Sequence, residues 1–293
     1  MKIIFIGTVK FSKHALLKLI SLKANIVGVC TLKKSNYNSD YVDLTSVCHE
    51  NNLEIHYMKN VNDNLTKEWI KKLRPDIIFC LGLSQIIGSD ILNIPAKGVV
   101  GYHPALLPAN RGRHPIIWAI ALGLKETGST FFFMDEGADS GDIISQKKIR
   151  ISYSDNAEKL YSKIIKTAVL QIEEFYHNLI LDNILAIKQD HKKANYWRKR
   201  TRSDGLIDWR MSAVNIFNLV RALSKPYIGA HFNYDSKIIN VWNCDVIEND
   251  SLNFEPGKVL SLTNEGILVK TGKDAIILKD IEPKISIELG EYL

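Results

Sequence analysis

Short apolar runs alternate with amphipathic segments along the first half of the chain. Apolar residues are almost continuous in four runs of strand length: Ile3–Ile6, Ile26–Leu32, Asp76–Cys80 and Gly98–Tyr102. Three segments between these runs carry apolar side chains at the spacing of one helix face: Phe11–Leu22, Val42–Glu50 and Leu65–Leu73. Strands that are apolar on both faces and separated by helices are typical of a mostly parallel sheet. The pattern therefore predicts an α/β, Rossmann-like domain over residues 1–190.

Two further helices are predicted in this domain. Helical spacing returns at Ile117–Leu124 and over a longer segment from Asp155 to about Leu181, for which Ser154 is the expected N-cap. The first turn, Gly7–Ser12, lacks the full G-x-G-x-x-G spacing. This turn therefore argues against a dinucleotide site.

The pattern changes near residue 190. A predicted linker over 191–210 leads into a helix that begins near Ala213 and is ended by Pro226. Short strands separated by turn residues follow: Ala230–Tyr234, Lys237–Val246, Gly257–Ser261, Gly266–Lys270 and Ala275–Ile281. Five short strands at this spacing predict a small, partly open barrel. The expected second domain, over 211–293, is thus β-barrel-like, of the OB type.

Composition excludes several classes of protein. The chain has 293 residues, 46% of them hydrophobic and 24% charged, as in an ordinary globular protein. It holds no apolar run of membrane-spanning length, and its apolar start is too short for a signal peptide. The chain has four widely spaced cysteines without metal-ligand spacing: Cys30, Cys48, Cys80 and Cys244. They predict buried free thiols, no bound metal and a cytoplasmic location. The net charge of +6 suits an anionic ligand without saying which.

Candidate chemistry gathers in two loops that follow apolar strands. The strand at Val99-Val100 leads to His103, in a Pro-punctuated loop that also carries Arg111, Arg113 and His114. A second apolar strand, Thr130–Met134, leads to Asp139 in a Gly-rich turn. Ligands bind beyond the carboxyl ends of strands in parallel α/β sheets, so we expect both loops at one site. A histidine held by an aspartate there is a candidate general acid or base.

These segments resemble the signature of the 10-formyltetrahydrofolate-dependent formyltransferases. The core motif of that family is Asn-x-His, a Leu-Pro-x-x-Arg-Gly loop and a later Asp, which His103, Leu107–Gly112 and Asp139 match in order and spacing. Further segments have counterparts in the family: Phe5–Thr8, Leu83–Ile87, Tyr196–Arg200, Asp204–Trp209, Arg221–Leu223 and Pro226–Ala230. The family includes methionyl-tRNA formyltransferase, glycinamide ribonucleotide formyltransferase and the sugar N-formyltransferases of bacterial surface-polysaccharide pathways, such as O-antigen and lipopolysaccharide biosynthesis.

The resemblance implies a reaction and its catalytic pair. In the family, an acceptor amine attacks the formyl carbon of the folate co-substrate and passes through a tetrahedral oxyanion. His103 would exchange the proton, and Asp139 would orient the histidine and favour its protonated form. The alternative is a structural hydrogen bond between the two side chains.

The resemblance also assigns contacts to the folate. Gln85, Ile86 and Ile87 match a short loop whose backbone reads the pteridine edge, and Arg113 matches an arginine beside the folate. The loop before the catalytic aspartate supplies the remaining matches: Asp135, Glu136, Gly137 and Ala138. Ile86 and Ile87 also suit plain core packing, and both roles are compatible with an apolar pocket.

Position 101 departs from the family, which has Asn where this chain has Gly101. Residues 101 and 103 share one face of a strand, so the amide that would stabilise the oxyanion is absent. Losing one such donor costs roughly 10²–10³ in rate in other enzymes. The missing side chain is expected to leave room for a water or a neighbouring group. Asn110 is the candidate catalytic donor, the alternatives being His114, a backbone N–H, or an Asn110 that only stabilises its turn.

The acceptor is expected to be a nucleotide-linked amino sugar. The loop Arg111–Trp118 resembles the sugar-nucleotide enzymes, whereas tRNA enzymes usually read Arg-Gly-Ala-Ala-Pro. The early loop Lys33–Ser39 is short beside the basic insertion of the tRNA enzymes, and the purine-pathway enzyme resembles only the first domain. Acidic residues balance the lysines of the second domain. These lysines are Lys237, Lys258, Lys270, Lys273 and Lys279. A tRNA-binding protein should present a stronger basic face.

Four residues around the predicted linker are candidate contacts to the nucleotide. Arg198 and Arg200 suit a diphosphate, and Trp197 or Tyr227 suits the base. The alternatives are a solvated basic linker and packing between domains. Two other functions stay open: a methionyl-tRNA formyltransferase, and a non-catalytic folate- or nucleotide-binding protein. An exposed strand edge in the second domain would permit a homodimer.

Overall fold

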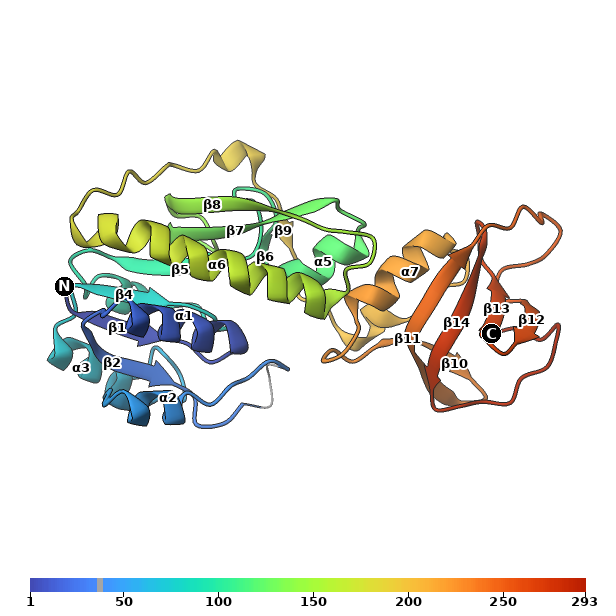
Figure 1. Ribbon diagram of the computed structural model, residues 1–293, viewed down its shortest axis with the longest axis horizontal. Helices are drawn as coiled ribbons and strands as arrows, with labels where there is room; N and C mark the ends of the chain where they lie inside the picture. Colours follow the sequence, from blue (N-terminus) through green and yellow to red (C-terminus); the bar gives the residue numbers. More distant parts are fainter. Residues whose placement is uncertain (36–38) are drawn as a thin grey trace. The chain divides into compact units, whose positions relative to one another are not determined.

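The computed structural model describes residues 1–35 and 39–293, and its Cα positions divide into two compact units (Figure 1). Unit 1 comprises Met1–Pro115, Thr127–Ile149 and Ser162–Trp197. Unit 2 comprises Ile116–Glu126, Arg150–Tyr161 and Arg198–Leu293. Within the described residues, we find no helix whose length and hydropathy would let it cross a membrane.

Unit 1 is built on a seven-stranded, mostly parallel sheet. The order across the sheet is β3 (Ile55–Tyr57), β2 (Ile26–Thr31), β1 (Ile3–Ile6), β4 (Ile77–Cys80), β5 (Val99–His103), β7 (Glu126–Phe133) and β8 (Ile143–Arg150). The first five of these strands pair in parallel. All side chains of β1 and nearly all of β4 are fully buried, which explains why the sequence runs are continuously apolar. The predicted mostly parallel α/β domain is therefore confirmed.

Helices connect parallel strands of unit 1 as the apolar spacing predicted: α1 (Lys10–Ser21), α2 (Thr45–Glu50) and α3 (Asn64–Leu73). The short α4 (Ser89–Leu92), which was not predicted, lies between β4 and β5, and the predicted long helix α6 (Ala157–Ile180) follows β8. The expected N-cap of α6 is wrong, since the helix begins at Ala157 and the side chain of Asn156 accepts from Lys159 N at 2.9 Å. Asn156 outcompetes Ser154 because it directly precedes the first helical residue.

The direction of β7 differs from the expectation. β7 runs antiparallel to β5, with Thr130 opposite His103 and Phe133 opposite Val100. The chain therefore leaves β7 beside the start of β5, and Asp139 does not follow a strand parallel to β5. The two loops still meet, because the segment after His103 folds back and pairs as β6 (Arg111–Gly112) with β9 (Tyr196–Trp197).

Unit 2 holds a five-stranded antiparallel sheet. Its order is β10 (Ala230–Tyr234), β11 (Lys237–Ile247), β14 (Ala275–Glu282), β13 (Gly266–Lys270) and β12 (Val259–Thr263). The unit also contains most of α5 (Pro115–Ala121) and all of α7 (Ala213–Ala222), whose N-cap Ser212 accepts from Asn215 N. All five predicted strands are present in one sheet, with β10 and β12 at its ends. The predicted second domain of five short strands is confirmed, and its sheet is antiparallel.

The segment predicted as a linker, 191–210, has structure of its own. It contains the 3₁₀ turns η1 (His191–Lys193) and η2 (Arg202–Gly205), with β9 between them. The boundary between the two units falls inside it, between Trp197 and Arg198. The part before the boundary belongs to the site described next.

Candidate active site

His103 is the last residue of β5 and is 4% exposed. Its Nδ1 lies 3.5 Å from Asp139 Oδ2, within ion-pair range but longer than a firm hydrogen bond. Its Nε2 lies 2.7 Å from the carbonyl oxygen of Asn110, which can only accept. Both ring nitrogens thus lie next to oxygen acceptors. The structure brings together the predicted pair.

Asp139 is held in a strained turn. Its backbone has φ of +55°, in the left-handed region. The Oδ2 atom accepts from Gly112 N at 2.9 Å, so the backbone of β6 fixes the carboxylate beside His103. Residues in this region cost about 1–3 kcal/mol and persist where their surroundings over-determine them. The turn is therefore built to aim one carboxylate oxygen at the histidine.

Asn110 contributes its main chain to the site. It also has a left-handed backbone, with φ of +65°, and its carbonyl accepts from His103. Its N–H donates to the side-chain oxygen of Asn195 at 2.7 Å. Among residues 1–35 and 39–293, the side-chain amide of Asn110 has no hydrogen-bond partner. This leaves the amide available to a ligand.

The space beside Gly101 is filled. A Cβ at this position would lie 2.7 Å from Met134 Cγ and 2.9 Å from Phe132 Cζ, closer than real Cβ contacts. The expectation that the missing side chain leaves room for a water or a swung-in group is therefore wrong. Phe132 is the direct cross-strand partner of Gly101, and Met134 follows on the same face, so their side chains occupy the volume.

The predicted folate loop and the arginine loop meet. Arg113 donates to Ser84 O at 3.1 Å, immediately before Gln85. The Gln85 side chain is tied down, because its Oε1 accepts from Val61 N at 2.7 Å. Ile87 is a core residue, whereas Ile86 is 78% exposed. The loop thus presents an apolar side chain and backbone groups next to the Arg113 guanidinium.

The other predicted folate residues form an exposed turn before Asp139. Asp135 organises it, since its Oδ1 accepts from Gly137 N at 3.0 Å and from Ser140 Oγ at 2.6 Å. Glu136 and Ala138 are exposed on the same turn. These side chains contribute no core packing, so their positions are free to serve a ligand.

Sequence reasoning missed two residues that contact the backbone of Asp139 and of Asn110. Gln189 donates to Asp139 O, and Asn195 accepts from Asn110 N. Both lie in the segment assigned to the end of the domain or to a linker. The one local signal was their position just before the Tyr196-Trp197 pair, which marks a strand that returns to β6.

The predicted nucleotide contacts fall in both units. Trp197 belongs to β9 in unit 1, and its carbonyl accepts from Arg113 N at 2.9 Å. Tyr227 is half-buried after α7 in unit 2. Arg198 and Arg200, also in unit 2, belong to the cluster described next.

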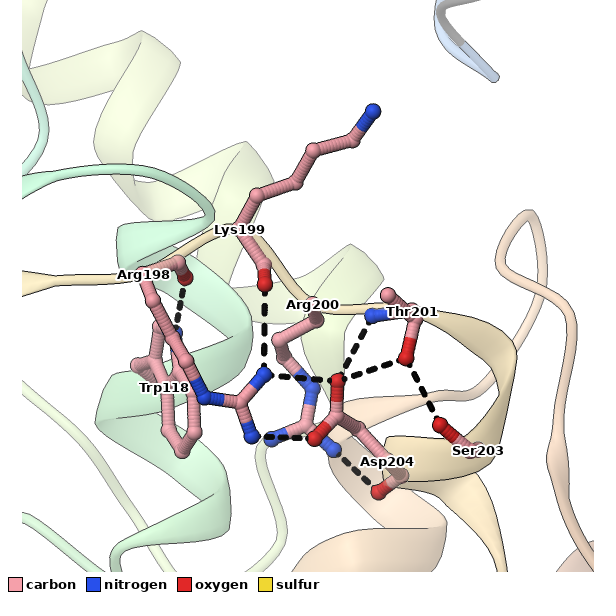
Figure 2. Close-up of polar contacts among 7 residues, drawn as sticks. All are labelled: Trp118, Arg198, Lys199, Arg200, Thr201, Ser203 and Asp204. Atoms are coloured by element: carbon pink, nitrogen blue, oxygen red, sulfur yellow. Dashed lines mark hydrogen bonds and ion pairs between the residues drawn. The ribbon is translucent and has the colours of Figure 1, made fainter.

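The two arginines predicted to bind phosphate share one aromatic partner (Figure 2). Their guanidinium carbons lie 5.4 Å (Arg198) and 4.5 Å (Arg200) from the ring centre of Trp118. Arg198 forms a bidentate pair with Asp204, which holds the pKa of that carboxyl well below its usual range. Arg200 is buried, which lowers its pKa, and it donates to Asp204 O at 2.5 Å. Arg198 therefore faces solvent, with 62% of its side chain exposed, whereas Arg200 mainly supports the cluster.

Comparison with known proteins gives the same class for both parts of the chain. Residues 1–172 match the family model described as formyl transferase, and residues 199–291 match the formyl transferase C-terminal domain. The chain therefore belongs to the formyltransferase family, and the expected enzyme class is confirmed.

Individual relatives divide between two acceptors. The chain is 31% identical over 299 residues to a methionyl-tRNA formyltransferase of Desulforamulus reducens, covering 100% of this chain and 94% of the relative. It also superposes on WlaRD, a sugar 3N-formyltransferase crystallised with dTDP and 5-N-formyl-THF (TM-score 0.71, 18% identity, 97% and 99% coverage). A Helicobacter canadensis N-formyltransferase in complex with folinic acid and dTDP-3-aminofucose is similar (TM-score 0.72, 17% identity, 95% and 99% coverage). At 18% and 17% identity, the similarity to these two structures shows the fold of this chain and nothing about its acceptor.

Proposed function

We propose that this protein transfers a formyl group from 10-formyltetrahydrofolate to the amine of a nucleotide-linked amino sugar. The proposal combines a donor site in unit 1, a catalytic pair and an acceptor of nucleotide-sugar chemistry. A product of this kind serves surface-polysaccharide or other glycan biosynthesis.

The donor side of the proposal rests on the loop at Gln85–Ile87 and on Arg113. A pteridine ring needs an apolar surface with a few fixed polar groups. The exposed Ile86 side chain supplies the apolar surface, and the backbone of the loop that Gln85 holds in place supplies the fixed polar groups. Arg113 adds a positive charge for the glutamate tail or the ring carbonyl of the folate. The residues present therefore fit a folate.

His103 moves the proton in the proposed reaction. The acceptor nitrogen forms a bond to the formyl carbon and loses one proton, while the bond from that carbon to N10 of the folate breaks and N10 gains a proton. Asp139 holds the imidazole and stabilises its charge while the proton is on the ring. The products are the N-formylated acceptor and tetrahydrofolate.

Asn110 supplies the oxyanion donor in this account. Its side-chain amide, for which the described residues supply no partner, lies on the residue whose carbonyl contacts His103, and Gly101 has no side chain to serve as donor. Asn110→Gly should lower kcat by roughly 10²-fold with little change in folate affinity, because only the transition state carries the negative oxygen. Glycine keeps the left-handed backbone without strain, so the carbonyl facing His103 stays in place. Single-turnover rates and folate titration check this prediction, and a wild-type rate in Asn110→Gly would exclude the side chain.

One observation carries the choice of a sugar acceptor. Three of the five lysines expected on the second domain contact partners within their own unit. Lys270 is buried and donates to two backbone carbonyls, Lys279 pairs with Asp245 at 2.6 Å, and Lys258 lies over two aromatic rings. These three lysines are therefore not free to add to a continuous basic face, which a tRNA acceptor stem needs. The predicted early loop, Lys33–Ser39, includes residues 36–38, which lie outside the described residues.

Arg198 is the proposed diphosphate contact. Arg198→Ala should raise the KM for a nucleotide sugar by about tenfold and leave the KM for the folate nearly unchanged, because a charge-assisted contact to phosphate is lost. Arg210→Ala is a matched control, since Arg210 forms the same kind of pair with Asp208 and is even more exposed. Steady-state kinetics of both variants test the assignment. Equal KM values for the acceptor in the wild type and in Arg198→Ala would overturn it. Either Trp197 or Tyr227 remains the proposed contact to the base, and Arg200 supports Arg198 through Trp118.

Methionyl-tRNA formylation is the second candidate, favoured by the 31% identity to a curated enzyme of that activity over the whole chain. The two candidates are separated by offering the protein 10-formyltetrahydrofolate with dTDP-, UDP- and GDP-linked amino sugars and, separately, with unformylated methionyl-tRNA. We expect a product one formyl group heavier from an amino sugar. Efficient formylation of the tRNA with no amino-sugar product would establish the second candidate.

We propose a cytoplasmic location, which agrees with the state of the cysteines. All four are buried free thiols, and burial raises the pKa of Cys48 to about 11 and of Cys80 to about 12. Thiols of this kind are ordinary in a reducing compartment.

The strands at the ends of the unit 2 sheet, β10 and β12, are the proposed edges for a homodimer.

A further inference from the structure

Gln189 is a buried glutamine whose three hydrogen bonds all serve the catalytic region. It is 6% exposed. Its Nε2 donates to Asp139 O at 2.9 Å and to Gly141 O at 2.7 Å, and its Oε1 accepts from Arg111 at 2.7 Å. One side-chain amide therefore clamps two carbonyls of the turn that carries the catalytic carboxylate.

This clamp acts on the strained part of the turn. Asp139 has a left-handed backbone, and such a residue keeps its conformation only where several contacts fix it. Gly112 N fixes the carboxylate from one side, and Gln189 fixes the peptide carbonyl from the other. With only the first contact, the carboxylate is free to turn with its backbone. The 3.5 Å separation from His103 depends on both.

Arg111 sets the orientation of the glutamine. It is 1% exposed, and its guanidinium also donates to Tyr196 Oη at 2.9 Å and contacts His191 Nδ1 at 3.1 Å. Because arginine has no acceptor, the amide oxygen of Gln189 must face it. The amide nitrogen then points at the turn of Asp139. A fixed chain of contacts thus runs from Arg111 through Gln189 and Asp139 to His103.

We infer that Gln189 is a positioning residue for formyl transfer, acting through Asp139 on His103. The inference rests on the proposed function, in which His103 and Asp139 form the catalytic pair. It assigns the segment before β9 to the active site through contacts with the backbone of the turn that carries Asp139.

Gln189→Glu is the sharpest variant. The carboxylate still accepts from Arg111, and this opposite charge keeps it ionised, but it no longer donates to the two carbonyls. We expect kcat with 10-formyltetrahydrofolate and dTDP-3-aminofucose to fall by roughly 10²-fold with unchanged KM for the folate, because a misplaced catalytic group lowers the rate more than binding. Gln171→Glu is the matched control, since Gln171 is also buried in unit 1 and donates to Ser129 O. That control should keep its rate.

A double-mutant cycle separates positioning from general damage. In an Asp139→Asn background, Gln189→Glu should change kcat by no more than about twofold, because the group that it positions is already gone. A further drop of roughly 10²-fold in that background would overturn the inference and leave the catalytic pair intact. Wild-type turnover in Asp139→Asn alone would instead reject the pair in the proposed function.

A second readout needs no acceptor. The ¹⁵N chemical shifts of the His103 ring, assigned with His103→Ala, report the protonation and hydrogen bonding of both nitrogens. Gln189→Glu should move the Nδ1 signal, and Gln171→Glu should leave it in place. An unmoved Nδ1 signal in folded Gln189→Glu would refute the positioning role. Gln189→Met, which removes the donor without adding charge, serves the same test if the glutamate variant does not fold.

Discussion

His103→Ala will abolish formyl transfer while binding of the folate stays close to normal. The imidazole acts on the proton that moves in the transition state, so its removal raises the barrier more than it weakens the ground-state complex. General acid–base catalysis contributes about 10²–10⁴ to the rate, and we expect a loss in kcat of at least that size. Single-turnover rates and a folate titration measure the two quantities separately.

Stability has to be followed in the same variant. His103 is buried and donates to Asn110 O, so its removal leaves an acceptor unpaired, at a cost of about 1–3 kcal/mol. His56→Ala is the matched control, because His56 is a half-buried histidine of unit 1 that stacks on Trp69 away from the pair. This control should lose stability and keep turnover. A near-normal kcat in folded His103→Ala would reject the assigned mechanism.

Asp139→Asn will reduce kcat by roughly 10²–10³-fold, because the imidazolium loses the negative charge beside Nδ1. Asparagine tolerates the left-handed backbone of this position, and its amide oxygen can still accept from Gly112 N. The turn should therefore keep its shape, so that the loss reports on charge. Steady-state kinetics and thermal unfolding check both halves of the prediction.

Asp135→Asn provides the control for Asp139→Asn. Asp135 lies on the same turn, but its carboxylate faces Gly137 N and Ser140 Oγ. Because Asp135 is a predicted folate contact, the control is measured at saturating folate, where it should weaken the turn slightly and leave kcat within a few-fold of the wild type. Equal losses in the two variants would mean that the turn as a whole, and not the Asp139 charge, is needed.

The sequence predicted the elements whose apolar pattern is unambiguous. β1 is buried on both faces and so reads as a continuous apolar run, and α3 carries apolar side chains at the spacing of one helix face. The direction of β7 was beyond this reasoning, because an apolar strand has the same pattern in either orientation. The two-residue strands β6 and β9 are too short for any period, although their pairing returns the loop to the site.

The candidate site was predictable only where a side chain carries the chemistry. His103 and Asp139 stand out by type and spacing, whereas Gln189 and Asn195 act on backbone atoms that no sequence pattern displays. The filled space at Gly101 likewise depends on Met134, a side chain brought in by the antiparallel partner strand. The different exposure of Arg198 and Arg200 follows from packing on Trp118, which joins segments eighty residues apart in the chain.

A competition assay tests the central claim most directly. The protein is given 10-formyltetrahydrofolate labelled in its formyl group, together with dTDP-, UDP- and GDP-linked amino sugars and unformylated methionyl-tRNA at equal concentration. The labelled products are then separated and identified by mass. We predict that the label enters a sugar nucleotide and not the tRNA, and that His103→Ala transfers it to no acceptor. Label found in the tRNA alone, or an intact donor with every acceptor unmodified, would contradict the account.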